Sequence, residues 1–255
     1  MNNHKMYVSI IIATNNSEKT IYDCLNSIKK QTYFNYEVII IDNASLDSTI
    51  EIVNSFKFEK IKIIKEKDNG IYEGLNKGIK NSSGDVVSIL HSDDLYYDND
   101  ALKKIVETFE KTKVDIIYSN LIYVKKNDVH SIVRLWKPGK FVVNSFLKGW
   151  NPPHPTFVVK RAIYNENDLY NQSIGNSADI ELMHRFLEIK KYNFFYLNEI
   201  LVKMRYGGAS NKKIISIIKQ NIMILKFLGI NNNLKRIIIF FISKFFDRLK
   251  QFILR

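Results

Sequence analysis

The strongest constraint on the fold is an alternation of short apolar runs with amphipathic segments through the first 125 residues. YVSIIIA (7–13) and YEVIII (36–41) are almost continuously apolar, as strands buried on both faces are. The segment between them carries apolar residues at helical spacing, at Ile21, Leu25 and Ile28. This rhythm predicts βαβ units, and hence an α/β fold with a mostly parallel sheet and helices on both faces.

The alternation continues for a while and then stops. Further strands are predicted at KIKIIKE, DVVSIL and VDIIYSNLIYV, and further helices at GIYEGLNKGIKN and 98–111. After about residue 125 the sequence becomes polar and proline-rich, followed by a helix over 179–190 and two basic helices in the last fifty residues. We therefore divide the chain into a body at 1–210, with halves at 1–125 and 126–210, and a basic amphipathic helical tail at 211–255.

Composition narrows the class of protein. The 255 residues are 45% hydrophobic, enough for a sizeable core, and no uninterrupted apolar stretch approaches the ~20 residues that span a bilayer. The single cysteine, Cys24, excludes an intrachain disulfide and a cysteine-based zinc cluster. The opening MNNHKMYVSIIIATNN lacks the features of a signal peptide. These observations predict a cytoplasmic protein.

Positive charge is concentrated near the C-terminal end. The net charge is +12, but the segment from Lys203 to Arg255 holds 12 Lys and Arg against one acid, so the rest of the chain is almost neutral. Within 234–255 the polar residues form a helical stripe beside a wide apolar face, which is typical of an interfacial helix on an anionic membrane. Packing into the core is the other interpretation of its phenylalanines. We favour a peripheral position at the inner face of the cell membrane.

Acidic and amide residues follow the ends of the predicted strands, where open parallel sheets bind their ligands. The ends read Thr14-Asn15-Asn16, Asp42-Asn43, Asp68-Asn69-Gly70 and His91-Ser92-Asp93-Asp94. No G-x-G-x-x-G follows the first strand and no G-x-x-x-x-G-K-[ST] occurs, so both glycine-rich phosphate loops are absent. The glycines at 70, 74 and 78 have helix-face spacing and are predicted to pack against the sheet.

The adjacent acids Asp93 and Asp94 repel each other unless a positive charge lies between them. A phosphate ligand bound by acids needs a divalent cation, and Mg²⁺ or Mn²⁺ takes one or two carboxylates together with phosphate oxygens. Capping of the following helix is another role that Asp commonly fills. The spacing alone leaves both interpretations open.

Four segments, taken together, resemble a known family: VSIIIATNN, IYDCLNSIKKQTYFNYEVIIIDNASLDSTIEIV, GIYEGLNKGIKNSSGDVVSILHSDD and SADIELMHRFL. In this order they are similar to the family-2 glycosyltransferases, a bacterial group with the GT-A nucleotide-sugar fold. The resemblance covers roughly residues 6–210. HPTF (154–157) and MRYGGAS (204–210) resemble segments of the lipopolysaccharide, O-antigen and capsule branch.

The resemblance implies a role for each matching position. It assigns Asp179 as the general base, His154 to the acceptor side, and Asp93 and Asp94 to a DXD-type site for Mn²⁺ or Mg²⁺. It assigns donor binding to Thr14, Asn15, Asp42, Asp68, Gly70, Asn76, Asp93 and Arg205. Two positions depart from the family pattern: His91 stands where Asp is common, and Ala178 replaces the usual Glu before the base.

The implied reaction is an inverting transfer of a sugar from a nucleotide sugar, expected to be a UDP-sugar, to a hydroxyl of a glycan acceptor. An undecaprenyl-diphosphate-linked acceptor would explain the apolar, basic tail. A non-catalytic nucleotide-sugar binder is an alternative because of His91 and Ala178, and Asp179 is also a residue type favoured in the first turn of any helix. A nucleotidyltransferase would open with a glycine-rich basic loop, and a nucleic-acid-binding protein would not place its bases on an apolar tail. We expect no nucleic-acid partner.

Overall fold

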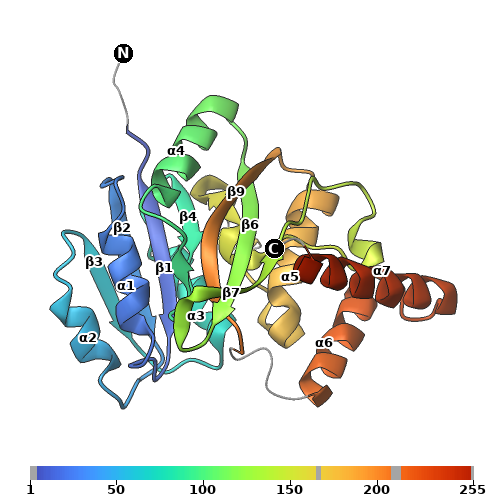
Figure 1. The fold of residues 1–255 in the computed structure, drawn as a ribbon, viewed down its shortest axis with the longest axis horizontal. Coiled ribbons are helices and arrows are strands. Elements are labelled where there is room, and N and C mark those ends of the chain that lie inside the picture. The colour runs from blue at the N-terminus through green and yellow to red at the C-terminus, as the bar shows by residue number, and fades with distance from the viewer. Residues whose placement is uncertain (1–4, 165–167, 208–213, 254–255) are drawn as a thin grey trace.

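The computed structural model describes residues 5–164, 168–207 and 214–253. Its N-terminal half contains the predicted βαβ units (Figure 1). The strands are β1 (Val8–Thr14), β2 (Tyr36–Asp42), β3 (Ile61–Lys65) and β4 (Val86–Ile89), and the helices are α1 (Ile21–Lys29), α2 (Thr49–Ser55) and α3 (Ile71–Lys80). The strands pair in parallel in the order β3-β2-β1-β4. Only α2, a short helix of seven residues, was not expected from the sequence here.

The second half continues the same sheet. After the short β5 (Leu95–Tyr96) and α4 (Ala101–Thr112), it adds β6 (Ile116–Lys125), β7 (Asp128–Trp136), β8 (Val158–Lys160) and β9 (Phe194–Arg205). The order runs on as β4-β8-β6-β9-β5, with β7 beside β6. The β6–β9 pair is parallel and the other new pairs are antiparallel. The α/β class is confirmed, with a parallel sheet in the first half and a mixed one in the second.

Short turns of helix connect the strands of the second half. They are η1 (Phe146–Lys148), η2 (His154–Thr156), η3 (Arg161–Ile163) and η4 (Gln172–Ser177). η4 leads directly into α5 (Ala178–His184), which continues as one π-helical turn, η5 (Arg185–Ile189). The predicted helix over 179–190 is therefore present, but β7, β8 and β9 were not predicted.

Helices cover both faces of the sheet, as the sequence pattern indicates. Along β1, Val8, Ile10 and Ile12 point to one face, where they pack in a core with apolar residues of α1 and α4. Ile11 and Ala13 point to the other face and join α3 and α5. This alternation follows from the two-residue period of a strand.

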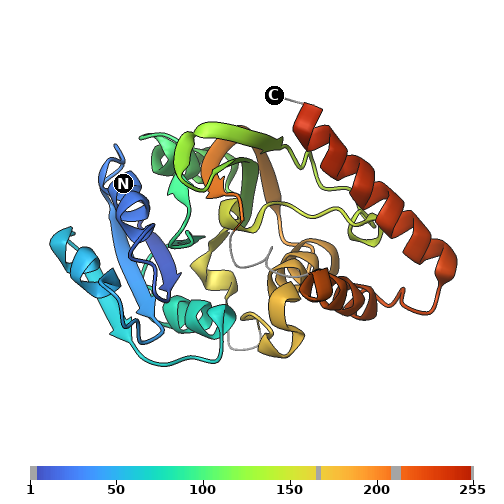
Figure 2. The same ribbon diagram turned by 60° about the horizontal axis from the view of Figure 1, so that its bottom comes forward.

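The tail forms α6 (Ile214–Phe227) and α7 (Leu234–Ile253), at the opposite end of the molecule from β3 and α2 (Figures 1 and 2). One face of α7 packs against η1 and β7, where Phe240 is 1% exposed. The side chain of Gln251 accepts a hydrogen bond from Arg134 Nη1 at 2.7 Å. None of the helices in the described parts of the chain combines the length and apolarity needed to cross a bilayer.

The outward face of α7 is apolar. Its exposed large side chains are Leu234, Ile238, Ile239, Phe241, Ile242, Phe245, Phe246, Leu249 and Phe252. Its polar residues Lys244 and Gln251 are less exposed and lie on the side of the body. Of the four phenylalanines between 240 and 246, only Phe240 packs into a core. The orientation is thus the reverse of an ordinary surface helix, whose apolar stripe faces inward.

Candidate functional site

The ends of β1 and β2 lie side by side, with Thr14 paired to Asp42 in the strand register. The Asp42 carboxylate accepts hydrogen bonds from the Ser45 backbone N–H at 3.0 Å and the Ser45 hydroxyl at 2.5 Å. Asn15 Nδ2 donates to the Asn43 carbonyl at 2.6 Å. The Thr14 hydroxyl is buried and has no hydrogen-bond partner among the described residues. These contacts bring three of the predicted donor residues to one edge of the sheet.

The loop between β3 and α3 joins the same edge. Asn43 Oδ1 accepts a hydrogen bond from the Asp68 backbone N–H at 2.9 Å, and Asp68 Oδ1 accepts one from the Gly70 N–H at 3.0 Å. Burial raises the pKa of the Asp68 carboxyl above its usual value. Gly70 has a φ of 142°, in the region that favours glycine. Asp68 and Gly70 therefore lie with the residues that follow β1 and β2.

The three glycines of this segment have different roles. A Cβ on Gly78 would lie 2.3 Å from Ile11 Cγ2, and one on Gly74 would lie 3.1 Å from Asp68 Oδ2. These two glycines allow α3 to approach β1 and the Asp68 loop closely, as the sequence predicted. The same prediction is wrong for Gly70, where a Cβ would meet nothing within 4 Å and the backbone conformation is the constraint.

The acidic loop after β4 places its two carboxylates in different environments. Asp93 is partly exposed, whereas Asp94 is fully buried and neither of its carboxylate oxygens has a hydrogen-bond partner within the described residues. Burial, with the charge of Asp93 adding to it and Arg205 opposing it, raises the pKa of Asp94 well above its usual value. The two neighbouring acids thus avoid full repulsion because the buried one favours its protonated form.

Arg205, at the end of β9, holds this loop in place. Its Nη1 donates to the Asp93 carbonyl at 2.8 Å, its Nε donates to the Lys126 carbonyl at 3.1 Å, and its Nη2 pairs with Asp23 of α1. The side chain is 5% exposed. The predicted contact with a donor phosphate would need N–H groups that these three partners do not use.

His154 and His91 lie together beside the acidic loop, with ring centroids 5.6 Å apart. His154 is buried, and its Nε2 is 2.7 Å from the Tyr170 hydroxyl. Burial, with His91 as a smaller cause, lowers the pKa of His154 to about 3, so this imidazole is neutral at physiological pH. Burial also lowers the pKa of His91, while Asp93 opposes the change.

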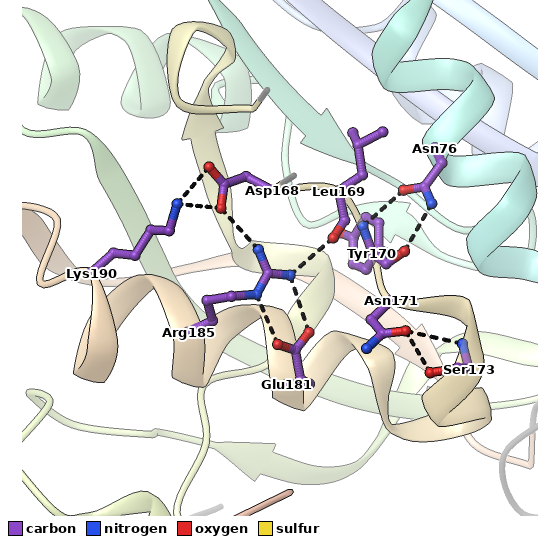
Figure 3. Close-up of polar contacts among 9 residues, drawn as sticks. All are labelled: Asn76, Asp168, Leu169, Tyr170, Asn171, Ser173, Glu181, Arg185 and Lys190. Carbon is purple, nitrogen blue, oxygen red and sulfur yellow. Dashed lines mark hydrogen bonds and ion pairs between the residues drawn. The ribbon is translucent and has the colours of Figure 1, made fainter. Parts of the chain in front are cut away.

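Asn76 ties α3 to the segment that precedes η4 (Figure 3). Its Nδ2 donates to the Tyr170 carbonyl and its Oδ1 accepts from the Tyr170 N–H, both at 2.9 Å. Arg185, the first residue of η5, holds the same segment through Asp168 at 3.1 Å and the Leu169 carbonyl at 2.9 Å. Both the oxygen and the nitrogen of the Asn76 amide are therefore occupied, and Asn76 connects α3 of the N-terminal half to the segment around Tyr170 in the second half. A cavity of about 570 Å³ lies beside these residues, not at the strand ends.

Asp179 lies in the first turn of α5, and its Oδ1 accepts a hydrogen bond from the Ile180 N–H at 2.8 Å. Burial raises the pKa of its carboxyl to about 6, against the lowering effects of hydrogen bonds, including one with the Tyr72 hydroxyl, and of the Lys244 charge. Tyr72 belongs to α3 and its ring packs against that of Tyr170, with the ring centroids 5.4 Å apart. A carboxylate with this pKa can accept a proton near neutral pH.

Comparison with known proteins decides the family. Residues 9–167 match the sequence profile described as Glycosyl transferase family 2. The chain belongs to this family. The Escherichia coli UDP-Glc:alpha-D-GlcNAc-diphosphoundecaprenol beta-1,3-glucosyltransferase WfaP is 29% identical over 236 residues, which cover 92% of this chain and 91% of that protein. The present protein is therefore a glycosyltransferase, as its four motifs indicate.

Solved structures confirm the GT-A-like fold of this transferase. S. aureus TarS 1–349 in complex with UDP-GlcNAc matches with a TM-score of 0.63 and 18% identity, over 93% of this chain and 79% of that one. The chain spans 65% of the TarS chain solved with UDP. The mannosyltransferase PcManGT from Pyrobaculum calidifontis, in complex with GDP-Man and Mn²⁺, matches with a TM-score of 0.64 and 18% identity, over 98% of this chain and 72% of that one.

Sequence reasoning missed several residues that shape the site of this glycosyltransferase. Asn43 joins the loops that follow β1 and β3. Tyr170 connects His154 to Asn76. Tyr72 and Lys244 both act to lower the pKa of Asp179. Asn43 follows a strand end, and that position is a signal that would have found it. The others lie in helices or irregular segments, where spacing carries no such signal. The 208–210 part of the MRYGGAS motif lies outside the described residues.

Proposed function

We propose that this glycosyltransferase moves a sugar from a UDP-sugar to a hydroxyl of a lipid-linked glycan, with inversion at the anomeric carbon. The observation that carries the proposal is Asp179. Its carboxyl has a pKa raised to about 6 and hydrogen-bonds with Tyr72, on the helix that follows the donor-side loop. Tyr72 is the second residue of α3, directly after the loop that carries Asp68, and Asn76 of the same helix bonds to the segment that leads to η4 and α5, so α3 links the proposed base to the proposed donor loop.

The donor side is the edge formed by Thr14, Asn15, Asp42, Asp68 and Gly70. Its carboxylates and amides suit the hydroxyl and N–H groups of a nucleoside. A UDP-sugar is supported by the UDP-GlcNAc in the TarS complex and by the UDP-Glc in the name of WfaP. The name of WfaP also supports an acceptor attached to undecaprenol through a diphosphate.

The chemical step is a single displacement. Asp179 takes the proton from the acceptor hydroxyl, the hydroxyl oxygen attacks the anomeric carbon, and the bond to the departing UDP breaks. The neutral His154 ring, fixed by Tyr170, lies on the acceptor side, where it orients polar groups without adding charge. Asp179 releases the proton to solvent after the product leaves.

The residues of the acidic loop fit a divalent cation held mainly by the substrate. Asp93 is the partly exposed carboxylate, while Asp94 is fully buried beneath it. No group of three or more His, Cys, Asp or Glu is arranged for a metal within the described residues. Mg²⁺ and Mn²⁺ commonly take one or two carboxylates, with phosphate oxygens and water filling the remaining positions. Asp93 is the residue that would hold it, and the bound cation would neutralise charge on the leaving diphosphate.

The first experiment separates donor binding from catalysis. A panel of nucleotide sugars is screened for thermal stabilisation of the protein with and without Mn²⁺, and the best donor is used with the Asp179→Asn variant. We expect the variant to bind the donor normally and to lose transfer by about 10²- to 10⁴-fold, because the general base is gone. Glu107→Gln, on the exposed surface of α4, is the matched control. Retained transfer in Asp179→Asn would remove it from the role of base.

The apolar outer face of α7, with α6 beside it, is the surface we assign to an anionic membrane. α6 adds exposed Ile215, Ile217, Ile218 and Ile222. Lys235 and Arg236 lie exposed at the start of α7, so cations border the apolar surface. An apolar face edged by Lys and Arg is the pattern of a helix that lies in the headgroup region. This position would bring the protein to the same surface as a lipid-linked acceptor.

Vesicle binding tests this surface. The protein with Phe245→Ser and Phe246→Ser is compared with the unchanged protein in sedimentation with vesicles containing anionic lipid. We expect the double variant to lose most of its binding, and binding of the unchanged protein to weaken with added salt. Phe34→Ser, an exposed phenylalanine before β2, is the control. Equal binding by all three proteins would contradict the assignment.

A further inference from the structure

Three cations lie along α7, one of them buried, one half-buried and one exposed, and none has a carboxylate within ion-pair distance in the described part of the chain. They are Arg134 of β7 and Lys244 and Arg248 of α7. Lys244 and Arg248 are one helical turn apart and therefore share a face. Elsewhere on the molecule, partly buried cations such as Arg185 and Arg205 do have acidic partners.

Arg134 is the most buried of the three, at 7% exposed. Its guanidinium stacks on the Tyr123 ring at 3.8 Å, and its Nη1 donates to Gln251 at 2.7 Å. Its Nε is buried and has no hydrogen-bond partner among the described residues. A buried guanidinium donor without a partner costs free energy unless a ligand or water satisfies it.

Lys244 occupies the end of this group that is nearer the proposed base. Its Nζ donates to Asn221 Oδ1 of α6 at 2.8 Å, and a Cβ on Gly149 would lie 3.0 Å from its Cβ. The preceding residue of α6, Gln220, is bonded to η4, the turn that leads into α5: its Nε2 donates to the Asn176 carbonyl at 2.8 Å. These contacts fix Lys244 beside the helix that carries Asp179.

The charges of Asp179 and Arg248 both act on the pKa of Lys244. Burial and then the charge of Arg248 lower its pKa to about 8, while Asp179 opposes the change. Burial and Arg248 are also among the causes that lower the pKa of Arg134. Arg248 thus repels both Arg134 and Lys244, and an anion beside Arg248 would relieve this repulsion.

We propose that Arg134, Lys244 and Arg248 form a binding site for the diphosphate of the lipid-linked acceptor, between the base and the membrane-facing surface of α7. The inference rests on the proposed function, because it assigns this anion to the acceptor. Guanidinium and ammonium groups are the side chains best suited to phosphate oxygens. The apolar outer face of the same helix lies where the attached lipid would enter the bilayer. The donor diphosphate has its own place at the Asp93 loop, which is why the second anion is given to the acceptor.

Farnesyl diphosphate is a soluble probe for this site. Its binding to the full chain is measured by calorimetry without vesicles, in the presence of saturating UDP and Mn²⁺ so that the donor site is filled. Lys244→Gln and Arg248→Gln are tested singly and together, and Lys250→Gln, on the same helix but paired with Asp247, is the control with the same change in charge. We expect each single variant to weaken binding by about tenfold, and the control to change it by less than about twofold.

The outcomes separate this proposal from the one on which it rests. If the two variants weaken UDP affinity as much as farnesyl diphosphate affinity, the cations serve the donor and the inference is overturned. If farnesyl alcohol binds as tightly as farnesyl diphosphate, the probe reports only the apolar surface and the inference is equally overturned. Absence of any UDP binding or transfer by the unchanged protein would instead contradict the proposed function. Unaltered acceptor KM in Lys244→Gln, with normal donor KM, would defeat the acceptor assignment alone.

Discussion

The proposed donor edge and the proposed acceptor side of this glycosyltransferase are built in different ways. At the donor edge, the polar residues end a strand or follow it within a few positions, and contacts such as Asn15 with Asn43 join adjacent loops of a parallel sheet. On the proposed acceptor side, Asp179 has Tyr72 of α3 and Lys244 of α7 as neighbours, and these two helices lie far apart in sequence. The geometry of the donor edge therefore follows from the repeated βαβ unit. The geometry around Asp179 depends instead on packing between segments that are far apart in sequence.

Helices α3 and α7 differ in the direction of their apolar faces. α3 has an apolar stripe toward the sheet, with Leu75 and Ile79 buried, and charged residues outward. α7 instead turns Lys244 and Gln251 toward the body and most of its large apolar side chains outward. Packing against the sheet therefore explains the pattern of α3, whereas the outward apolar face of α7 is explained by the membrane contact that we propose.

The largest effect expected is on the attachment of α7. Phe240→Ala should lower the free energy of unfolding by about 3 kcal/mol, because a buried phenylalanine leaves a cavity between α7 and the body. Phe245→Ala, on the exposed face, should change it by less than about 0.5 kcal/mol. Urea unfolding followed by circular dichroism measures both. Equal effects would mean that α7 is not held on the body as described.

The next effect concerns the hydrogen bonds by which Asn76 connects α3 to the Tyr170 segment. Asn76→Ala removes both hydrogen bonds to the Tyr170 backbone and leaves buried polar groups unpaired, so we expect a loss of about 2 kcal/mol. Asn54→Ala, an exposed position on α2, is the control and should be almost neutral. Thermal and urea unfolding check the values. A neutral Asn76→Ala would show that the segment before η4 is held by Arg185 alone.

A smaller effect should distinguish the two adjacent acids. Asp93→Asn is expected to weaken Mn²⁺-dependent UDP binding by about tenfold, equal to about 1.4 kcal/mol. Asp94→Asn should weaken it by less than about twofold, because the raised pKa of Asp94 already favours a neutral side chain. Calorimetric titration with and without Mn²⁺ compares them. A larger loss in Asp94→Asn would reverse the two roles.

The smallest effect is the dependence of transfer on pH. Asp179 must be deprotonated to accept a proton, so with its pKa raised to about 6, kcat/KM should fall as pH decreases and reach about half its plateau at pH 6. Tyr72→Phe removes a hydrogen bond that lowers this pKa, so the half-point should move to higher pH. Initial rates are measured between about pH 5 and pH 8, because this range brackets the pH at which a side chain with this pKa titrates. A half-point near the ordinary pKa of Asp would contradict the burial of the base.

The sequence by itself determined the α/β class, the elements from β1 to α4 apart from α2 and β5, and the set of polar residues at the ends of β1 to β4. It did so because periodicity and strand-end position are local properties of the chain. It also identified the family, through four motifs taken together in their order along the chain. The strands β8 and β9 escaped prediction because their partners lie far away in sequence, and β7 because its faces are mostly exposed and only partly apolar.

Only the tertiary structure decided what each candidate residue contacts. It buried Asp94 and left Asp93 partly exposed, although the two are adjacent in sequence. It engaged Arg205 with Asp23 and the Asp93 carbonyl, and it bonded Lys244 to Asn221 of α6. The physical reason is that exposure, hydrogen bonding and pKa depend on which distant segments pack together, and no local pattern records that choice.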